Sequence, residues 1–223
     1  MTLAPQARNL FIPATFLAIV FLMSQDHLLQ ETIRSIRSPL WTITMKGATL
    51  SGDFRLLLVV FGLLWVGGDL LPRRGSVQTA PAHNTLSWMG KWGMIGLFLT
   101  RVVVEISKAL IGRERPYMIA PGMGDQGPLF FGPILDRDFA SFPSGHAAST
   151  AVVAGLLSVA FPAAQPPLFF WTTLVGLSRV ALNEHFVSDV VAGTMLGYCM
   201  ALTLKAWAVA PPTRAHTHPH QGN

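Results

Sequence analysis

The sequence has few charged residues for its length. Lys, Arg, Asp and Glu make up 12% of its 223 residues, which is about half the share found in a typical soluble domain. Hydrophobic residues make up 51% and fall in several long runs. This composition indicates a membrane protein rather than a soluble protein with an oversized core. The single cysteine, Cys199, excludes an internal disulfide framework.

Acidic residues are scarcer still, 11 against 16 basic ones, which leaves a formal net charge of +5. The basic residues are dispersed among the hydrophobic runs instead of forming one arm or stripe. That distribution argues against nucleic acid as a partner and suits an anionic lipid surface, so the expected partner is the membrane bilayer. The length predicts a single domain over residues 1–210, followed by a polar tail, 211–223, that we expect to be disordered.

The hydrophobic runs predict six membrane spans. They are Leu10–Met23, Phe54–Leu71, Met89–Leu110, Ala147–Phe161, Leu168–Asn183 and Val187–Ala208. Between the first two, Leu28–Gly52 carries apolar residues at helical spacing. This segment is either an amphipathic helix at the membrane interface or a helix packed on the bundle. The predicted fold class is therefore all-α, a bundle of six transmembrane helices with an interfacial amphipathic segment and one active-site face.

Polar residues that could bind a ligand or take part in catalysis collect on one face of this bundle. The third predicted span ends near Lys108, the fourth begins at His146, and the sixth begins near Asp189. Antiparallel spans place these ends on the same side of the membrane. The linker 72–84, on the other side, contains two arginines and no acid. The positive-inside rule makes that linker cytoplasmic, so the polar face is expected to lie outside.

Ser144-Gly145-His146 stands where the fourth span begins. The first N–H groups of a helix lack intrahelical partners, and the helix dipole favours negative charge there. A hydroxyl, free N–H groups and an imidazole in one place therefore predict a site for a phosphate-like oxyanion.

Three motifs occur in order on the polar face. They are Lys108-x6-Arg115-Pro116, Pro143-Ser144-Gly145-His146 and Ser178-Arg179-x5-His185-x3-Asp189. Together they resemble the three-part signature of the type 2 phosphatidic acid phosphatase and vanadium haloperoxidase superfamily, matching at all the defining positions. The resemblance covers residues 108–189 directly, and the six-span layout extends it to most of the chain.

The resemblance implies a role for each matched residue. His185 takes the nucleophile position and forms a phosphohistidine, Asp189 holds its second ring nitrogen, and His146 protonates the leaving group. The phosphate-binding set is Lys108, Arg115, Ser144, Gly145 and Arg179. No metal and no other cofactor is required, because the cations stabilise the phosphoryl charge. Neighbouring charged residues receive no role, namely Arg101, Glu105, Arg113, Glu114 and Glu184.

The function expected from this resemblance is that of an integral-membrane lipid phosphatase, with its site on the outer face of a bacterial inner membrane. Its substrate would be a polyprenyl diphosphate, phosphatidic acid, phosphatidylglycerol phosphate or a lipid A phosphate. A lipid phosphotransferase would use the same residues. A haloperoxidase with bound vanadate is disfavoured because those relatives are soluble. A non-enzymatic transporter is the remaining alternative, and no oligomeric state is predicted.

Overall fold

The structure is a computed structural model, and it describes residues 5–70, 85–119, 129–133 and 136–208, with side chains from residue 14 to residue 205. In this part of the chain all regular structure is helical, as the all-α prediction expected. The α-helices are α1 (Pro5–Ser35), α2 (Pro39–Leu50), α3 (Phe54–Leu70), α4 (Thr85–Ile111), α5 (Gly145–Ala160), α6 (Gln165–Ala181) and α7 (Val187–Ala208). Short 3-10 helices are η1 (Pro116–Met118), η3 (Arg137–Phe139) and η4 (Pro162–Ala164). The predicted tail, 211–223, and most of the linker 72–84 lie outside the described residues.

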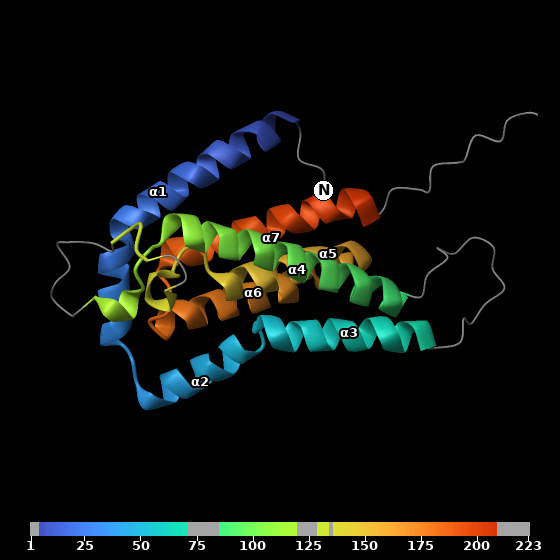
Figure 1. Cartoon of the computed structure of the whole chain (residues 1–223), viewed down its shortest axis with the longest axis horizontal. Helices are drawn as coiled ribbons and strands as arrows, with labels where there is room; N and C mark the ends of the chain where they lie inside the picture. Colours follow the sequence, from blue (N-terminus) through green and yellow to red (C-terminus); the bar gives the residue numbers. More distant parts are fainter. Residues whose placement is uncertain (1–4, 71–84, 120–128, 134–135, 209–223) are drawn as a thin grey trace, which may run out of the picture.

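Helix α5 forms the centre of the bundle and packs against α4, α6 and α7 (Figure 1). Val152 and Leu156 of α5 are buried in one apolar cluster with Leu97 of α4 and Leu204 of α7. Phe61 extends the cluster onto α3, which packs along α4. Helix α2 lies against α6, and α1 against α7 and α6. The bundle therefore has one apolar core, and the loops that carry the sequence motifs emerge at one end of it.

Small residues allow α5 and α7 to approach closely. A Cβ atom added to Gly193 would overlap the carbonyl oxygen of Ser144, and one added to Gly197 would overlap that of Ala148. On the facing side, a Cβ on Gly155 would lie 2.5 Å from the Cβ of Ala201. Backbone meets backbone along this pair of helices, as the small-residue stripe of the last predicted span suggests.

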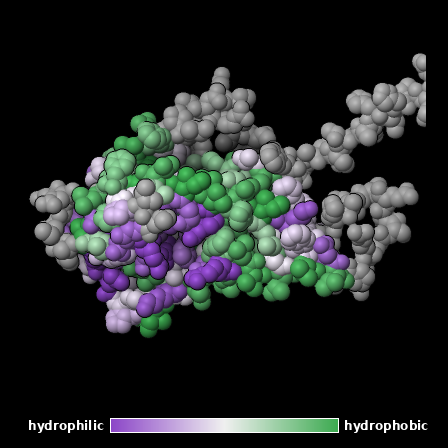
Figure 2. All heavy atoms as spheres, viewed as in Figure 1, coloured by the Kyte–Doolittle hydropathy of each residue, from purple (hydrophilic) through white to green (hydrophobic). Residues whose placement is uncertain are grey.

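The outside of the bundle is rich in large apolar side chains. Examples that are more than half exposed are Phe16, Leu17, Phe21, Leu63, Val66, Phe98, Leu110, Phe169 and Phe170. Figure 2 shows hydrophobic residues over much of one face, with hydrophilic residues gathered toward the end drawn at the left. An apolar exterior of this extent is typical of a surface that contacts lipid or a partner rather than water.

Fewer of the observed helices are long and apolar enough to cross a membrane than the six spans that we predict from the sequence. Among the described helices, α7 is long and apolar enough to cross a membrane over Val187–Lys205. The pair α2 and α3, bent by 41°, qualifies if it is counted as one broken span. Helix α5 is apolar but shorter, and α4 carries Arg101, Glu105 and Lys108 in its second half. The six-span arrangement therefore stays a prediction.

The predicted amphipathic segment Leu28–Gly52 is not one element. Helix α1 continues through Ser35, so it joins the first predicted span to the start of this segment. A new helix begins at Pro39, where the Ser38 hydroxyl accepts a hydrogen bond from the N–H of Trp41 at 3.2 Å. A proline disfavours the helical conformation in the residue before it and suits the first helical position, which explains the break.

The close packing of α5 and α7 can be tested with two glycine substitutions. Gly197→Ala forces the new methyl group against the Ala148 carbonyl, so we expect it to lower the free energy of unfolding by about 1–3 kcal/mol. Gly47→Ala is the matched control, because a Cβ on this exposed residue of α2 meets nothing within 4 Å. It should leave stability unchanged or raise it by up to about 1 kcal/mol. Thermal unfolding in detergent measures both; equal effects would contradict the packing described.

Candidate active site

The three sequence motifs converge at one end of the bundle. Lys108 lies in the last turn of α4, Arg179 in the last turn of α6, and Asp189 in the first turn of α7. Ser144 is the N-cap residue of α5. Its backbone N–H donates to the carbonyl oxygen of Asp189 at 3.0 Å. That hydrogen bond joins the N-termini of α5 and α7 beside His185, which lies in the α6–α7 connection.

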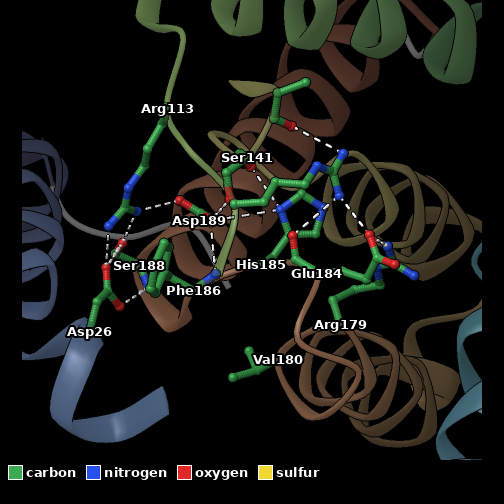
Figure 3. Close-up of polar contacts among 12 residues, drawn as sticks. Asp26, Arg113, Ser141, Arg179, Val180, Glu184, His185, Phe186, Ser188 and Asp189 are labelled. Atoms are coloured by element: carbon green, nitrogen blue, oxygen red, sulfur yellow. Dashed lines mark hydrogen bonds and ion pairs between the residues drawn. The ribbon is translucent and has the colours of Figure 1, made fainter. Parts of the chain in front are cut away.

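His185 is buried, and its tautomer follows from one contact (Figure 3). Its Nδ1 lies 2.7 Å from the backbone carbonyl oxygen of Ser141. A carbonyl oxygen only accepts hydrogen bonds, so Nδ1 carries the proton and Nε2 holds a free electron pair. Burial lowers the pKa of His185 to about 3, against the opposing effect of Asp189. At neutral pH the imidazole is therefore uncharged, the form in which a histidine can act as a nucleophile.

Asp189 lies near this imidazole but is not its shortest contact. Its Oδ2 is 3.7 Å from Nδ1 of His185, whereas the same oxygen accepts from the Ser141 hydroxyl at 2.6 Å and from the Phe186 N–H at 2.8 Å. The sequence predicts that Asp189 holds the ring directly. In the structure Asp189 holds Ser141, and the carbonyl of Ser141 holds the ring.

Arg113 forms the buried centre of a charge network that the sequence motifs leave out. Its guanidinium donates to Asp26 of α1 at 2.9 Å, to the Ser188 hydroxyl at 2.7 Å, and to Asp189 (Figure 3). It also lies 4.3 Å from the centroid of the Phe186 ring. Arg113, Asp26 and Asp189 have side chains that are 0% exposed. Charges at such depth require partners. Asp26 and Arg113 escape prediction from the sequence because both lie outside the predicted spans, so no pattern in the sequence marks them as buried.

Arg115 and Arg179 share one carboxylate. Nη1 of Arg115 lies 2.7 Å and Nη2 of Arg179 lies 3.4 Å from the same oxygen, Oε2 of Glu184. The side chain of Glu184 is 38% exposed, whereas those of the two arginines are nearly buried. Two guanidiniums that point at one oxyanion form a geometry that also fits phosphate oxygens. Glu184, left without a role at the sequence level, occupies that position in this structure.

The N-terminus of α5 faces further cations. A Cβ on Gly145 would lie 3.7 Å from Nη1 of Arg101 and 3.9 Å from Nζ of Lys108. Glu105 links these two side chains, at 3.0 Å from Arg101 and 3.6 Å from Lys108, as their common helix face predicts. The hydroxyl oxygen of Ser144 is buried and has no hydrogen-bond partner in the part of the chain that the structure describes. Cations, free N–H groups and an unpaired hydroxyl together suit an oxyanion.

The last of the matched residues, His146, lies on the first turn of α5. Its Nε2 is 4.0 Å from Oδ2 of Asp53, and each side chain is 26% exposed. Asp53 comes from the connection between α2 and α3, a segment that the motifs do not include. Within the described ranges, no group of three or more His, Cys, Asp or Glu side chains is placed to hold a metal ion.

The chain is similar to known proteins, and the family match includes the three motifs. Residues 92–211 match the PAP2 superfamily. The chain is 28% identical over 118 residues to lipid A 1-phosphatase of Rhizobium johnstonii, in an alignment that covers 52% of this chain and 47% of that protein. It is 31% identical over 154 residues to decaprenylphosphoryl-5-phosphoribose phosphatase of Mycobacterium tuberculosis, covering 69% of this chain and 73% of that one. The match to the Rhizobium protein thus spans about half of that protein's length.

The fold matches a solved membrane protein. The crystal structure of the first transmembrane PAP2 type phosphatidylglycerolphosphate phosphatase from Bacillus subtilis aligns with a TM-score of 0.62 at 25% identity. The alignment covers 87% of this chain and 94% of that one. The likeness therefore extends over the helices that precede residue 92 as well.

The Arg113 network predicts a large loss of stability when its cation is removed. Arg113→Met leaves the carboxylates of Asp26 and Asp189 buried without a counter-charge, so we expect the free energy of unfolding to fall by about 3–5 kcal/mol. Arg37→Met, at an exposed arginine between α1 and α2, should change it by less than about 0.5 kcal/mol. Unfolding in detergent checks both, and a small effect of Arg113→Met would show that the network does not support the fold.

Proposed function

The chain belongs to the PAP2 superfamily, and on that premise we propose that it is a membrane-embedded phosphatase that hydrolyses the phosphate ester or diphosphate of a lipid. The single observation that carries the proposal is the state of His185. Its imidazole is neutral, with Nε2 unprotonated, and it lies beside the cation-lined N-terminus of α5. A free imidazole nitrogen next to an oxyanion site is what nucleophilic attack on phosphorus needs.

The proposed reaction begins with binding of the phosphate group. Its non-bridging oxygens are held by Lys108, Arg115 and Arg179 and by the N–H groups at the start of α5, with the Ser144 hydroxyl as a further donor. The guanidiniums exchange the carboxylate of Glu184 for phosphate oxygens. These fixed cations and dipoles stabilise the charge that spreads over the phosphoryl group in the transition state.

Two transfers complete the reaction. Nε2 of His185 attacks phosphorus, the bond from phosphorus to the ester oxygen breaks, and His146 gives its proton to the departing oxygen. Water then attacks the phosphohistidine, His146 takes a proton from that water, and the nitrogen–phosphorus bond breaks to release phosphate. Nδ1 of His185 keeps its proton throughout, because it donates to the carbonyl of Ser141. The resulting partial positive charge on the ring stays close to Asp189.

The membrane setting gives a lipid access to this site. We propose that six spans cross the membrane and place the site at the outer face of a bacterial inner membrane, in a single domain over residues 1–210. The apolar exterior of the bundle supports this arrangement. Phe131, whose N–H donates to the carbonyl of Ile111 at the end of α4, is 85% exposed, so it can contact acyl or prenyl chains while the headgroup reaches the cations. The named relatives act on lipid phosphates, but their substrates differ, so the lipid is identified by assay.

The proposal is tested by phosphate release from purified protein across a panel of lipid phosphates and diphosphates. His185→Ala should lower the release rate by at least about 10³-fold, because it removes the nucleophile. His27→Ala is the matched control, since this histidine of α1 pairs with Glu31 at 4.0 Å and belongs to no part of the site. The control should keep the wild-type rate. Full activity in His185→Ala, or no release from any lipid by the wild type, would overturn the proposed function.

A second experiment tests the position of Glu184 between the two arginines. Since phosphate must replace this carboxylate, Glu184→Gln should lower the inhibition constants of orthophosphate and vanadate by about 10-fold, or about 1.4 kcal/mol. Glu31→Gln, on α1, serves as the control and should leave both constants unchanged. If Glu184→Gln instead weakens inhibition, the carboxylate holds the guanidiniums in place and does not compete with the substrate.

A further inference from the structure

The corner between α2 and α3, residues 49–53, docks onto the active site from outside the segment that matches the PAP2 superfamily. The Thr49 hydroxyl accepts a hydrogen bond from Nη1 of Arg179 at 2.9 Å. Two residues later, the Ser51 hydroxyl accepts from the indole N–H of Trp171 on α6, also at 2.9 Å. A Cβ on Gly52 would lie 2.5 Å from Cγ1 of Val175 on α6, so the backbone fits tightly there. The corner is therefore held in a defined place beside the site.

Asp53, the last residue of this corner, has its carboxylate held by the start of α3. Its Oδ1 accepts from the N–H groups of Arg55 at 2.9 Å and Leu56 at 3.3 Å, which caps the helix. Partial burial raises the pKa of Asp53, but these N–H groups and the charge of Arg55 outweigh it and hold that pKa below its usual value. The carboxylate therefore stays ionised. Its second oxygen, Oδ2, is left to face Nε2 of His146 at 4.0 Å.

The other charged groups that face His146 are cationic. Arg179 approaches from α6, and Lys108 and Arg101 approach from α4, where Glu105 pairs with both of them. Burial, followed by these cations, lowers the pKa of His146 to about 3, against the opposing effect of Asp53. Three cations that gather around a phosphate oppose a fourth positive charge on the imidazole. An acid that gives its proton to the leaving group must carry that charge before it reacts. A bound phosphate group brings negative charge to this imidazole, and Asp53 adds to that charge from the side of the α2–α3 corner.

We propose that Asp53 is a positioning residue that favours the protonated form of His146 and orients it as the general acid, and that the α2–α3 corner is thus a fourth part of the active site. This inference rests on the proposed function. When the ester bond breaks, the leaving oxygen takes the proton of the His146 imidazolium, which becomes neutral. In the hydrolysis step the proton of the attacking water returns to His146. Asp53 stays ionised throughout and exchanges no proton.

The variant Asp53→Asn removes the charge and keeps the shape. Asparagine caps a helix about as well as aspartate, so α3 should keep its start. We expect kcat/KM for a long-chain alkyl phosphate to fall by about 10-fold or more, because general acid assistance is weakened. For p-nitrophenyl phosphate, whose leaving group departs without a proton, kcat/KM should change by less than about 3-fold. The alkaline limb of the alkyl phosphate profile should move to lower pH.

Matched variants distinguish this role from a structural one. Asp69→Asn, at the other end of α3 where the carboxylate accepts from Ser87 at 2.5 Å, should keep both activities. Asp53→Ser also caps a helix, and it should reproduce the selective loss. Thermal unfolding of each variant shows that the fold is retained. In a His146→Asn background, Asp53→Asn should have no further effect on alkyl phosphate turnover, because the two residues act as one unit.

The outcomes are distinct. An equal loss on both substrates, or a full effect of Asp53→Asn in the His146→Asn background, would overturn the role of Asp53 and leave the proposed function standing. A wild-type protein that releases phosphate from neither substrate would overturn the proposed function itself, and this inference with it. Selective loss on the alkyl phosphate that disappears in the double variant is the result expected.

Discussion

The rest of the structure depends on the ion pairs of the buried Arg113 guanidinium. It pairs with Asp26 on α1 and with Asp189 on α7, and all three side chains are excluded from solvent. A buried cation is tolerated only when its partners are in place, so α1, α7 and the segment after α4 must meet at one point. Asp189 then holds Ser141, whose carbonyl sets the tautomer of His185. The imidazole proposed as the nucleophile is thus oriented by a buried charge network that lies behind it.

Backbone packing brings the N-terminus of α5, the proposed anion site, close to His185. Because Gly193 has no side chain, α7 approaches the start of α5 closely enough for the N–H of Ser144 to reach the carbonyl of Asp189. The N-termini of α5 and α7 are therefore joined by a main-chain hydrogen bond. The glycines of α7 allow α5 and α7 to meet at one site. The charged side chains around that site then favour an anion as its ligand.

The cations of the site are paired with carboxylates. Glu184 lies between Arg115 and Arg179, and Glu105 lies between Arg101 and Lys108. Like charges held close together repel one another, and an intervening carboxylate reduces that cost. A phosphate group offers more oxygens and more charge than a carboxylate, which is why we propose that it replaces Glu184 at the guanidiniums. The α2–α3 corner adds Asp53 on the side of His146.

The helical class follows from the sequence alone, because long hydrophobic runs are a local property. The grouping of the motif residues at one end also follows, because helices that alternate in direction bring every second connection to the same end. The number of spans does not follow, since length and composition single out α7 and the bent pair of α2 and α3 among the described helices. Only the tertiary structure pairs Arg113 with Asp26, 87 residues away, and makes the Ser141 carbonyl, rather than Asp189, the closest partner of His185. Those contacts join segments that are remote in the sequence. Tertiary packing decides which segments meet, and no local sequence pattern records that packing.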